Sequence, residues 1–392
     1  MINTIQFLLA VGGLMLAGLL LDAIGRRSFL PRVTLLICLG VLIGPSLFNL
    51  LPPALMSEFD LITSIALAMV GFMLGGRLTL EALREFGKEI FWISLIGAIG
   101  TCLIVAIGLL AIGQPIIIAL LLAGIATATA PAAVADVVSN FKTESPFATK
   151  LLDIVALDDV WGLIIFSICV AFALITDGNH SVLNTLGIAG FEIGGAILLG
   201  VLLGVPASYL TGRITAGEPS LAEALGIVFI CSGLALWLEV SFLIASMTLG
   251  IVVTNLAKHH TRPFHEIKGV EGPVLVLFFV LAGATLQIDS LAEVGPLLIF
   301  YVLFRFLAKL MSGWLGAKLA GSNAPTRRWI GLALTPQAGV AMGMVLIAVN
   351  RFPQQGTTVL PVILASTVIF ELTGPILTRL AISREAQQST LE

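Results

Sequence analysis

The sequence predicts an all-α membrane protein with 13 transmembrane helices. Hydrophobic residues make up 58% of the 392 residues, charged residues make up only 11%, and the mean hydropathy is +1.08. A soluble protein of this length would need more polar surface. Apolar stretches of roughly 20 residues, enough for one helix to cross a bilayer, also recur along the whole chain. Lys and Arg are also concentrated in every second loop between these stretches.

The predicted spanning segments follow one another with only short breaks. Numbered 1 to 13 in chain order, they cover residues 4–24, 33–50, 61–79, 90–112, 115–139, 149–175, 185–211, 221–238, 241–257, 267–287, 293–320, 327–350 and 356–381. We therefore expect neither a soluble domain nor a nucleotide-binding domain in the chain. Segment 1 has no basic region before its apolar run, so we interpret it as a retained helix rather than a signal peptide.

Lys and Arg residues lie almost entirely on one side of the predicted membrane. Of the 20, only Arg351 falls on the opposite side, while Arg305 and Lys309 lie inside segment 11. Because basic residues accumulate in cytoplasmic loops, the N-terminus is predicted to lie outside and the C-terminus in the cytoplasm. No basic run suggests nucleic acid as a partner, and we expect lipid to surround the chain.

Asp158 and Asp159 lie inside the apolar run of segment 6. An ionisable group in hydrocarbon is costly, so acids that are kept deep in a span are candidates for function. Consecutive helical residues point about 100° apart, so the two carboxylates can line two sides of one polar cavity. The alternative is that the pair caps a helix start, but the apolar pattern already runs from Leu151.

Arg305 and Lys309 are four residues apart in segment 11 and therefore share a helix face. A buried lysine can pair with a carboxylate and can also release its proton, whereas an arginine stays charged and is better at holding structure. We therefore place Lys309 at the same site as the acids and give Arg305 a structural role. Snorkelling toward the membrane interface is the alternative for Lys309.

Prolines interrupt segments 5 and 12. A proline inside a span removes a backbone hydrogen bond, and in a membrane the freed carbonyls are tolerated where they line a cavity. Simple proline kinks are the alternative for either segment alone. We predict two broken helices whose breaks are lined by Thr127, Thr129, Ala130, Pro131, Thr335, Pro336 and Gln337.

The two interrupted segments are antiparallel in the predicted topology, and each precedes a segment with a buried acid, which is typical of an inverted repeat. The chain is then divided into an extra N-terminal helix (1–28), a first repeat (29–180), connector helices (181–238), a second repeat (239–384) and a short cytoplasmic tail (385–392).

Three other groups of ionisable residues lie outside the acid pair and its basic partners. Glu371 lies in the middle of segment 13 and is predicted to pair with Arg305 or to cap a broken helix. Asp153 could draw cations toward the site, with a solvated position as the preferred alternative. The histidines at positions 259, 260 and 265 are interpreted as part of a solvated basic loop rather than as a pH sensor or metal site.

With these motifs in this order, the chain resembles the cation:proton antiporter superfamily, and within it the bacterial sodium/proton antiporters of the NapA and NhaA kind. The resemblance covers essentially the whole chain. It implies an NhaA-like fold in the bacterial inner membrane, with a core of crossed broken helices that moves against a dimerising panel to which segment 1 contributes. It also implies that Asp159 is the primary ion ligand and that Asp158 pairs with Lys309.

Two departures from this family pattern matter. Some relatives carry an acid where this chain has Ala130, so Thr129 and backbone carbonyls must contribute more of the ion coordination. Electroneutral relatives tend to carry Asn-Asp where this chain has Asp158-Asp159. The resemblance therefore implies an electrogenic exchanger, with Asp159, Asp158 and Thr129 as the predicted sodium ligands.

The predicted function is secondary transport: sodium or lithium is exchanged for protons by alternating access, without a cofactor and without enzymatic chemistry. Cation and proton would compete for the same carboxylates. Potassium/proton antiport is the first alternative, and a sodium-coupled organic anion symporter of related fold is the second. A channel is a further alternative and would need no alternating access. An intramembrane prenyltransferase fits the sequence poorly, because it would need a second Asp-rich motif.

Overall fold

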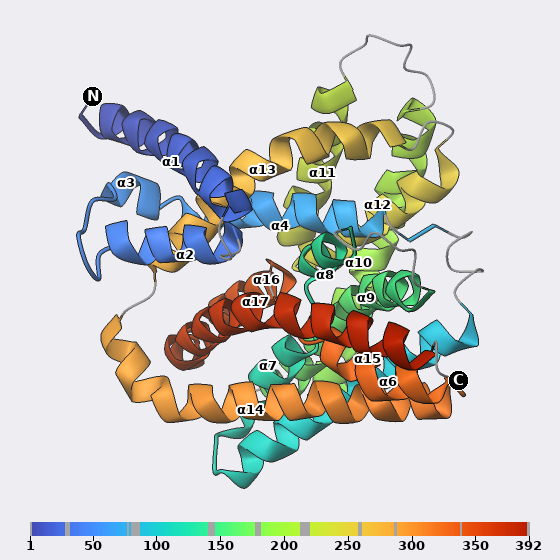
Figure 1. The fold of residues 1–392 in the computed structure, drawn as a ribbon. Coiled ribbons are helices and arrows are strands. Elements are labelled where there is room, and N and C mark those ends of the chain that lie inside the picture. Colours follow the sequence, from blue (N-terminus) through green and yellow to red (C-terminus); the bar gives the residue numbers. More distant parts are fainter. Residues whose placement is uncertain are drawn as a thin grey trace. The chain divides into compact units, whose positions relative to one another are not determined.

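The computed structural model describes residues 2–27, 32–76, 78–79, 87–139, 146–176, 182–211, 220–257, 261–285, 288–337 and 339–389. These residues form 16 helices and no strands (Figure 1), so the predicted all-α class is confirmed. The chain divides into two compact units. Unit 1 comprises Met1–Glu85 and Leu186–Thr285, and unit 2 comprises Phe86–Thr185 and Leu286–Glu392.

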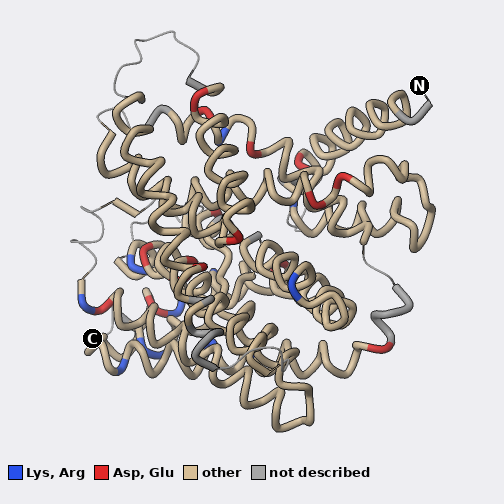
Figure 2. The backbone as a smooth tube through the Cα atoms, turned by 180° about the vertical axis from the view of Figure 1, so that it is seen from behind, with Lys and Arg blue, Asp and Glu red and all other residues tan. Residues whose placement is uncertain are grey.

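Within the described residues, 7 helices are long and apolar enough to cross a membrane. Shorter apolar helices cover Arg32–Ile43, Phe59–Gly75, Ile116–Ala126, Leu221–Trp237, Phe242–Leu256 and Val340–Arg351. Each predicted segment overlaps one of these helices, although the count of 13 membrane crossings stays a prediction. Figure 2 shows long stretches of backbone that carry no Lys, Arg, Asp or Glu.

Unit 1 is built from pairs of closely packed helices. Its helices are α1 (Ile2–Arg27), α2 (Arg32–Ile43), α3 (Pro53–Met56), α4 (Phe59–Gly75), α10 (Val182–Thr211, of which the first residues belong to unit 2), α11 (Ser220–Trp237), α12 (Phe242–Leu256) and α13 (Thr261–Ala284). The contact between α4 and α12 depends on glycine: a Cβ atom at Gly75 or at Gly250 would overlap the backbone of the opposite helix.

Unit 2 contains the interrupted helices. Its helices are α6 (Lys88–Ala111), α7 (Ile116–Ala126), α8 (Pro131–Ser139), α9 (Pro146–Thr176), α14 (Ile288–Leu319), α15 (Ala324–Ala333), α16 (Gly339–Arg351) and α17 (Pro353–Ser389). α6 packs along α14, where the hydroxyls of Thr101 and Ser312 are 3.2 Å apart. α9 packs against α6 and α7, and α17 packs against α15 and α16.

Each predicted repeat contributes to both units. Residues 29–85 and 239–285 belong to unit 1, and residues 86–180 and 286–384 belong to unit 2. An inverted repeat whose halves are shared in this way would produce the division into two units, but the repeat itself stays a prediction.

Two ends of the predicted segments differ most from the ends of the observed helices. α2 ends at Ile43, although the second segment was predicted to reach residue 50. Pro45 disfavours helix at the residue before it, turns follow at 45–48, and Asn49 adopts a φ of 48°. α17 instead continues to Ser389, beyond the predicted end at residue 381, because residues 384–388 are good helix formers.

We expect Gly75→Ala to lower the free energy of unfolding by about 1–3 kcal/mol, because the added methyl group would push α4 away from the α12 backbone. Thermal or chemical unfolding in detergent measures this loss. Gly226→Ala on α11 is the matched control, because a Cβ atom there meets nothing within 4 Å. Equal destabilisation of the two variants would contradict the prediction.

Candidate functional site

The first interruption lies between α7 and α8 in unit 2. α7 ends at Ala126 and α8 begins at Pro131, whose fixed φ and missing N–H suit the first position of a helix. The residues between them are not helical, and Thr127, Thr129 and Ala130 are almost completely buried. The carbonyls of Ala126, Thr127 and Ala128 lie at the end of α7 or just beyond it and lack the usual intrahelical donors, so this buried segment needs other donors.

The second interruption lies between α15 and α16. α15 ends at Ala333 and α16 begins at Gly339, and the buried residues Thr335, Pro336 and Gln337 lie between the two helices. The two interruptions touch each other, since the backbone N–H of Ala130 donates to the Pro336 carbonyl at 3.0 Å. The sequence predicted both interruptions, and the structure brings them together.

Arg305 of α14 is fully buried and donates hydrogen bonds to both interruptions. Its Nε donates to the Ala126 carbonyl at 3.1 Å, and Nη2 donates to the Ala128 carbonyl at 2.8 Å. On the other side, Nη1 donates to the Thr335 carbonyl at 2.8 Å, and Nη2 lies 3.5 Å from the Pro336 carbonyl. One guanidinium group therefore supplies donors to the C-terminal ends of α7 and α15.

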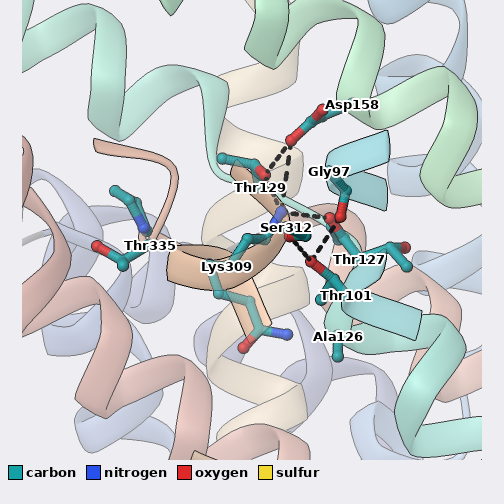
Figure 3. Close-up of polar contacts among 12 residues, drawn as sticks. Gly97, Thr101, Ala126, Thr127, Thr129, Asp158, Lys309, Ser312 and Thr335 are labelled. Atoms are coloured by element: carbon teal, nitrogen blue, oxygen red, sulfur yellow. Dashed lines mark hydrogen bonds and ion pairs between the residues drawn. The ribbon is translucent and has the colours of Figure 1, made fainter. Parts of the chain in front are cut away.

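Lys309 lies one helical turn after Arg305 and is 1% exposed. Its Nζ donates to the Thr127 carbonyl at 2.9 Å and to the Thr129 hydroxyl at 2.8 Å (Figure 3). It also lies 3.4 Å from Oδ2 of Asp158, with which it forms a salt bridge. These three oxygen atoms account for the three N–H donors of the ammonium group.

The acids of the site lie on α9. Asp158 is completely buried, and its Oδ2 accepts a hydrogen bond from the Thr129 hydroxyl at 2.8 Å. The Thr129 hydroxyl therefore links Lys309 to Asp158, accepting from one and donating to the other (Figure 3). Asp159 follows directly along the same helix and is 1% exposed. Two acids and two basic groups are thus buried in one unit.

The charges in this site offset one another. Burying a single charge is expensive, whereas oppositely charged groups that are close together and hydrogen-bonded offset part of the cost. The C-terminal ends of α7 and α15 carry partial negative charge because of their unpaired carbonyls, which favours the nearby cations. The site is thus a compact polar cluster that is surrounded by apolar helices.

Gln337 and Tyr301 add a polar contact that the sequence did not fully predict. The Gln337 side-chain amide donates to the Tyr301 hydroxyl at 3.3 Å and lies 3.5 Å from the Ile125 carbonyl. Tyr301 is completely buried, four residues before Arg305. Its spacing with Arg305 and Lys309, four residues each, was the signal available in the sequence, because it places all three on one face of α14.

The ring of Phe370 on α17 also belongs to the surroundings of the site. It lies 4.3 Å from the guanidinium carbon of Arg305. The next residue, Glu371, is 4% exposed, and its predicted pairing with Arg305 or role as a helix cap stays a prediction. Asp153, on α9, is only partly buried.

The predicted basic loop is only partly visible. His259 and His260 lie outside the described residues, whereas His265 belongs to α13 in unit 1. His265 therefore lies outside the unit that holds the site.

Comparison with known proteins gives a consistent picture. The family model described as sodium/hydrogen exchanger, transmembrane, matches residues 11–382. The chain is 24% identical, over 84% of its length and 83% of the relative, to the ammonium/H(+) antiporter subunit AmhT of Alkalihalophilus pseudofirmus. A shorter match, 31% identical, to the glutathione-regulated potassium-efflux system protein KefC of Salmonella typhi covers 41% of this chain but only 26% of that relative.

Among solved structures, the sodium proton antiporter MjNhaP1 from Methanocaldococcus jannaschii has a similar fold. The TM-score is 0.76, and the match covers 99% of this chain and 98% of that chain at 20% sequence identity. At this identity the similarity establishes the fold.

We expect Thr129→Val to lower the free energy of unfolding by about 1–3 kcal/mol, because it removes the hydroxyl that joins Asp158 to Lys309 in a buried place. Thr129→Ser is the matched control, since it keeps the hydroxyl and loses only a methyl group. Unfolding of the purified variants in detergent measures both values. A loss for Thr129→Ser as large as that for Thr129→Val would rule out the hydroxyl as the cause.

Proposed function

The chain belongs to the sodium/hydrogen exchanger family of the cation:proton antiporter superfamily, and we propose that it exchanges sodium or lithium for protons across the membrane by alternating access. The family consists of multi-span membrane transporters rather than enzymes. The observation that carries the proposal is the buried pair Asp158-Asp159 beside two interrupted helices.

We propose that Asp159 is the primary cation ligand, assisted by the Thr129 hydroxyl, by carbonyls of the first interruption and by Asp158. Hard oxygen atoms of this kind suit an alkali cation and can replace its hydration shell. The donors of Lys309 occupy the Thr127 carbonyl, the Thr129 hydroxyl and Asp158. A cation that uses these oxygens therefore has to displace the lysine ammonium.

Antiport then follows from competition. Cation and proton use the same carboxylates, so the site crosses the membrane with one or the other and not with both. The two adjacent acids titrate as a coupled pair. No cofactor is required in this scheme, because the cation and the proton themselves neutralise the carboxylates in turn.

We propose that unit 2, which holds every residue of the site, is the moving body of the alternating-access cycle. Unit 1, with α1, would then form the dimerising panel of a homodimer. The apolar side chains of α1 support this assignment: Leu8, Leu9 and Leu16 are 65%, 71% and 65% exposed and would need lipid or a second copy to cover them.

We further propose the NhaA-like arrangement of 13 crossings in a bacterial inner membrane, with the N-terminus outside and the C-terminus cytoplasmic. The positive-inside distribution of Lys and Arg supports this orientation. Under this scheme monovalent cations, protons and lipid are the partners of the chain.

The relatives keep potassium and ammonium as alternative cations. The two relatives above are named for ammonium and for potassium, so the experiment below includes both ions. Organic anion symport fits less well, because it needs a basic group for the substrate. The donors of Arg305 and Lys309 are directed at protein oxygens instead.

Asp159→Asn should abolish cation-dependent proton movement, because an amide carries no negative charge and cannot exchange a proton. The measurement is dequenching of a pH-sensitive dye in everted vesicles on addition of sodium, lithium, potassium or ammonium. Vesicles without the protein correct for passive ammonia diffusion. Asp60→Asn, at an exposed position on α4, is the control and should match the wild type. Full activity of Asp159→Asn would overturn the assignment.

Asp158→Asn should keep exchange but make its rate insensitive to membrane voltage, because one of the two site carboxylates is lost while Asp159 remains. Proteoliposomes under an imposed membrane potential measure the rate, with wild type expected to respond to the potential. If Asp158→Asn responds to voltage as the wild type does, the second carboxylate does not determine electrogenicity.

A further inference from the structure

The two basic residues of α14 divide the carbonyls of the first interruption between them. Arg305 binds the carbonyls of Ala126 and Ala128, and Lys309 binds the carbonyl of Thr127 that lies between them in sequence. Arg305 also reaches the second interruption, whereas the hydrogen bonds described for Lys309 all end on the first interruption and on Asp158.

Arginine suits the position that spans both interruptions. Its planar guanidinium presents five N–H donors in a fixed fork, while a lysine ammonium has three donors around one atom. The four carbonyls bonded to Arg305 come from the ends of two different helices, and a point charge cannot face both with good geometry. The Phe370 ring, 4.3 Å away, further fixes the guanidinium plane.

We propose that Arg305 is a positioning residue: it keeps the Thr127–Thr129 segment aligned with the second interruption while Lys309 is displaced by the transported cation. This inference rests on the proposed exchange function. Arg305 does not touch the ion, and it acts through the carbonyls and hydroxyl that do. When the bonds of Lys309 break, those of Arg305 remain, so the crossing of the two interrupted helices survives the step that empties or fills the site.

The first test is hydrogen–deuterium exchange of the purified full chain in detergent. Arg305→Lys should speed exchange in peptides from both interruptions, residues 120–135 and 330–342. Lys309→Gln should speed exchange only in the first. The matched control is Arg327→Lys, since Arg327 lies in the same unit and its Nε donates to a single carbonyl, that of Ser322, at 2.6 Å. It should leave both peptides unchanged.

The second test separates positioning from a merely structural role. In proteoliposomes, Arg305→Lys should raise the apparent KM for the cation about tenfold or more per folded protein, with the pH midpoint of activity unchanged. Lys309→Gln should shift the pH midpoint, because it removes the positive charge 3.4 Å from Oδ2 of Asp158. If Arg305→Lys only lowers protein yield or Tm and keeps the wild-type KM, or if it shifts the pH midpoint as Lys309→Gln does, the proposal is wrong.

If Arg305→Lys does not fold, Phe370→Leu provides an independent test. It removes the ring beside the guanidinium but no hydrogen bond of Arg305, and it should raise the KM about two- to fivefold, the effect expected for losing a cation–π contact. Phe278→Leu, a buried phenylalanine of unit 1, is its control and should keep the wild-type KM. An unchanged KM in Phe370→Leu would then reject the proposal.

The two kinds of failure can be told apart. A wild-type protein that exchanges none of the four cations rejects the proposed function. Hydrogen–deuterium exchange remains readable in that case, since it needs no transported ion.

Discussion

Unpaired backbone carbonyls at two buried helix interruptions are the constraint on which the site depends. In a chain with only 11% charged residues, few groups can supply donors at that depth. The structure solves this with side chains from one helix: α14 places Arg305 and Lys309 one turn apart, and together they satisfy carbonyls from both interruptions. The donors of α14 thus compensate the unpaired carbonyls of the two interruptions. The same basic groups offset part of the cost of burying the acids of α9.

Charge balance explains why the buried ionisable groups occur as a set. Asp158 is held by the Thr129 hydroxyl and by Lys309, and Lys309 is in turn held by the Thr127 carbonyl. At position 130 this chain has alanine, whose backbone N–H bonds the Pro336 carbonyl. Since this position contributes no acid, the negative charge that faces the two basic residues comes from α9. The removal of one member would leave its partners buried without compensation.

The sequence alone predicted much of this arrangement because the signals were local. The length of the apolar stretches indicated the helices, and prolines inside two of them indicated the interruptions. The cost of burying a charge identified Asp158 and Lys309 as candidates for function. The contacts of Arg305 could not be predicted, since they depend on how two interruptions about 200 residues apart in the sequence meet, as the bond from Ala130 to Pro336 shows. Local turn chemistry at Pro45 and Asn49 was the cause of the misplaced end of α2.

In such a site, cation binding and proton release can be coupled by hydrogen bonds and ion pairs at the site itself, without a separate gate. The ammonium of Lys309 contacts oxygens that suit a monovalent cation, and in the proposed mechanism it competes with that cation for them. In that mechanism an entering ion reaches these oxygens by releasing the lysine from Asp158, and the loss of the nearby positive charge would change the affinity of the acids for protons. Arg305 has no such competitor, because its partners are carbonyls directed at the guanidinium. The proposed mechanism therefore places the exchangeable and the permanent contacts of the site one turn apart on the same helix.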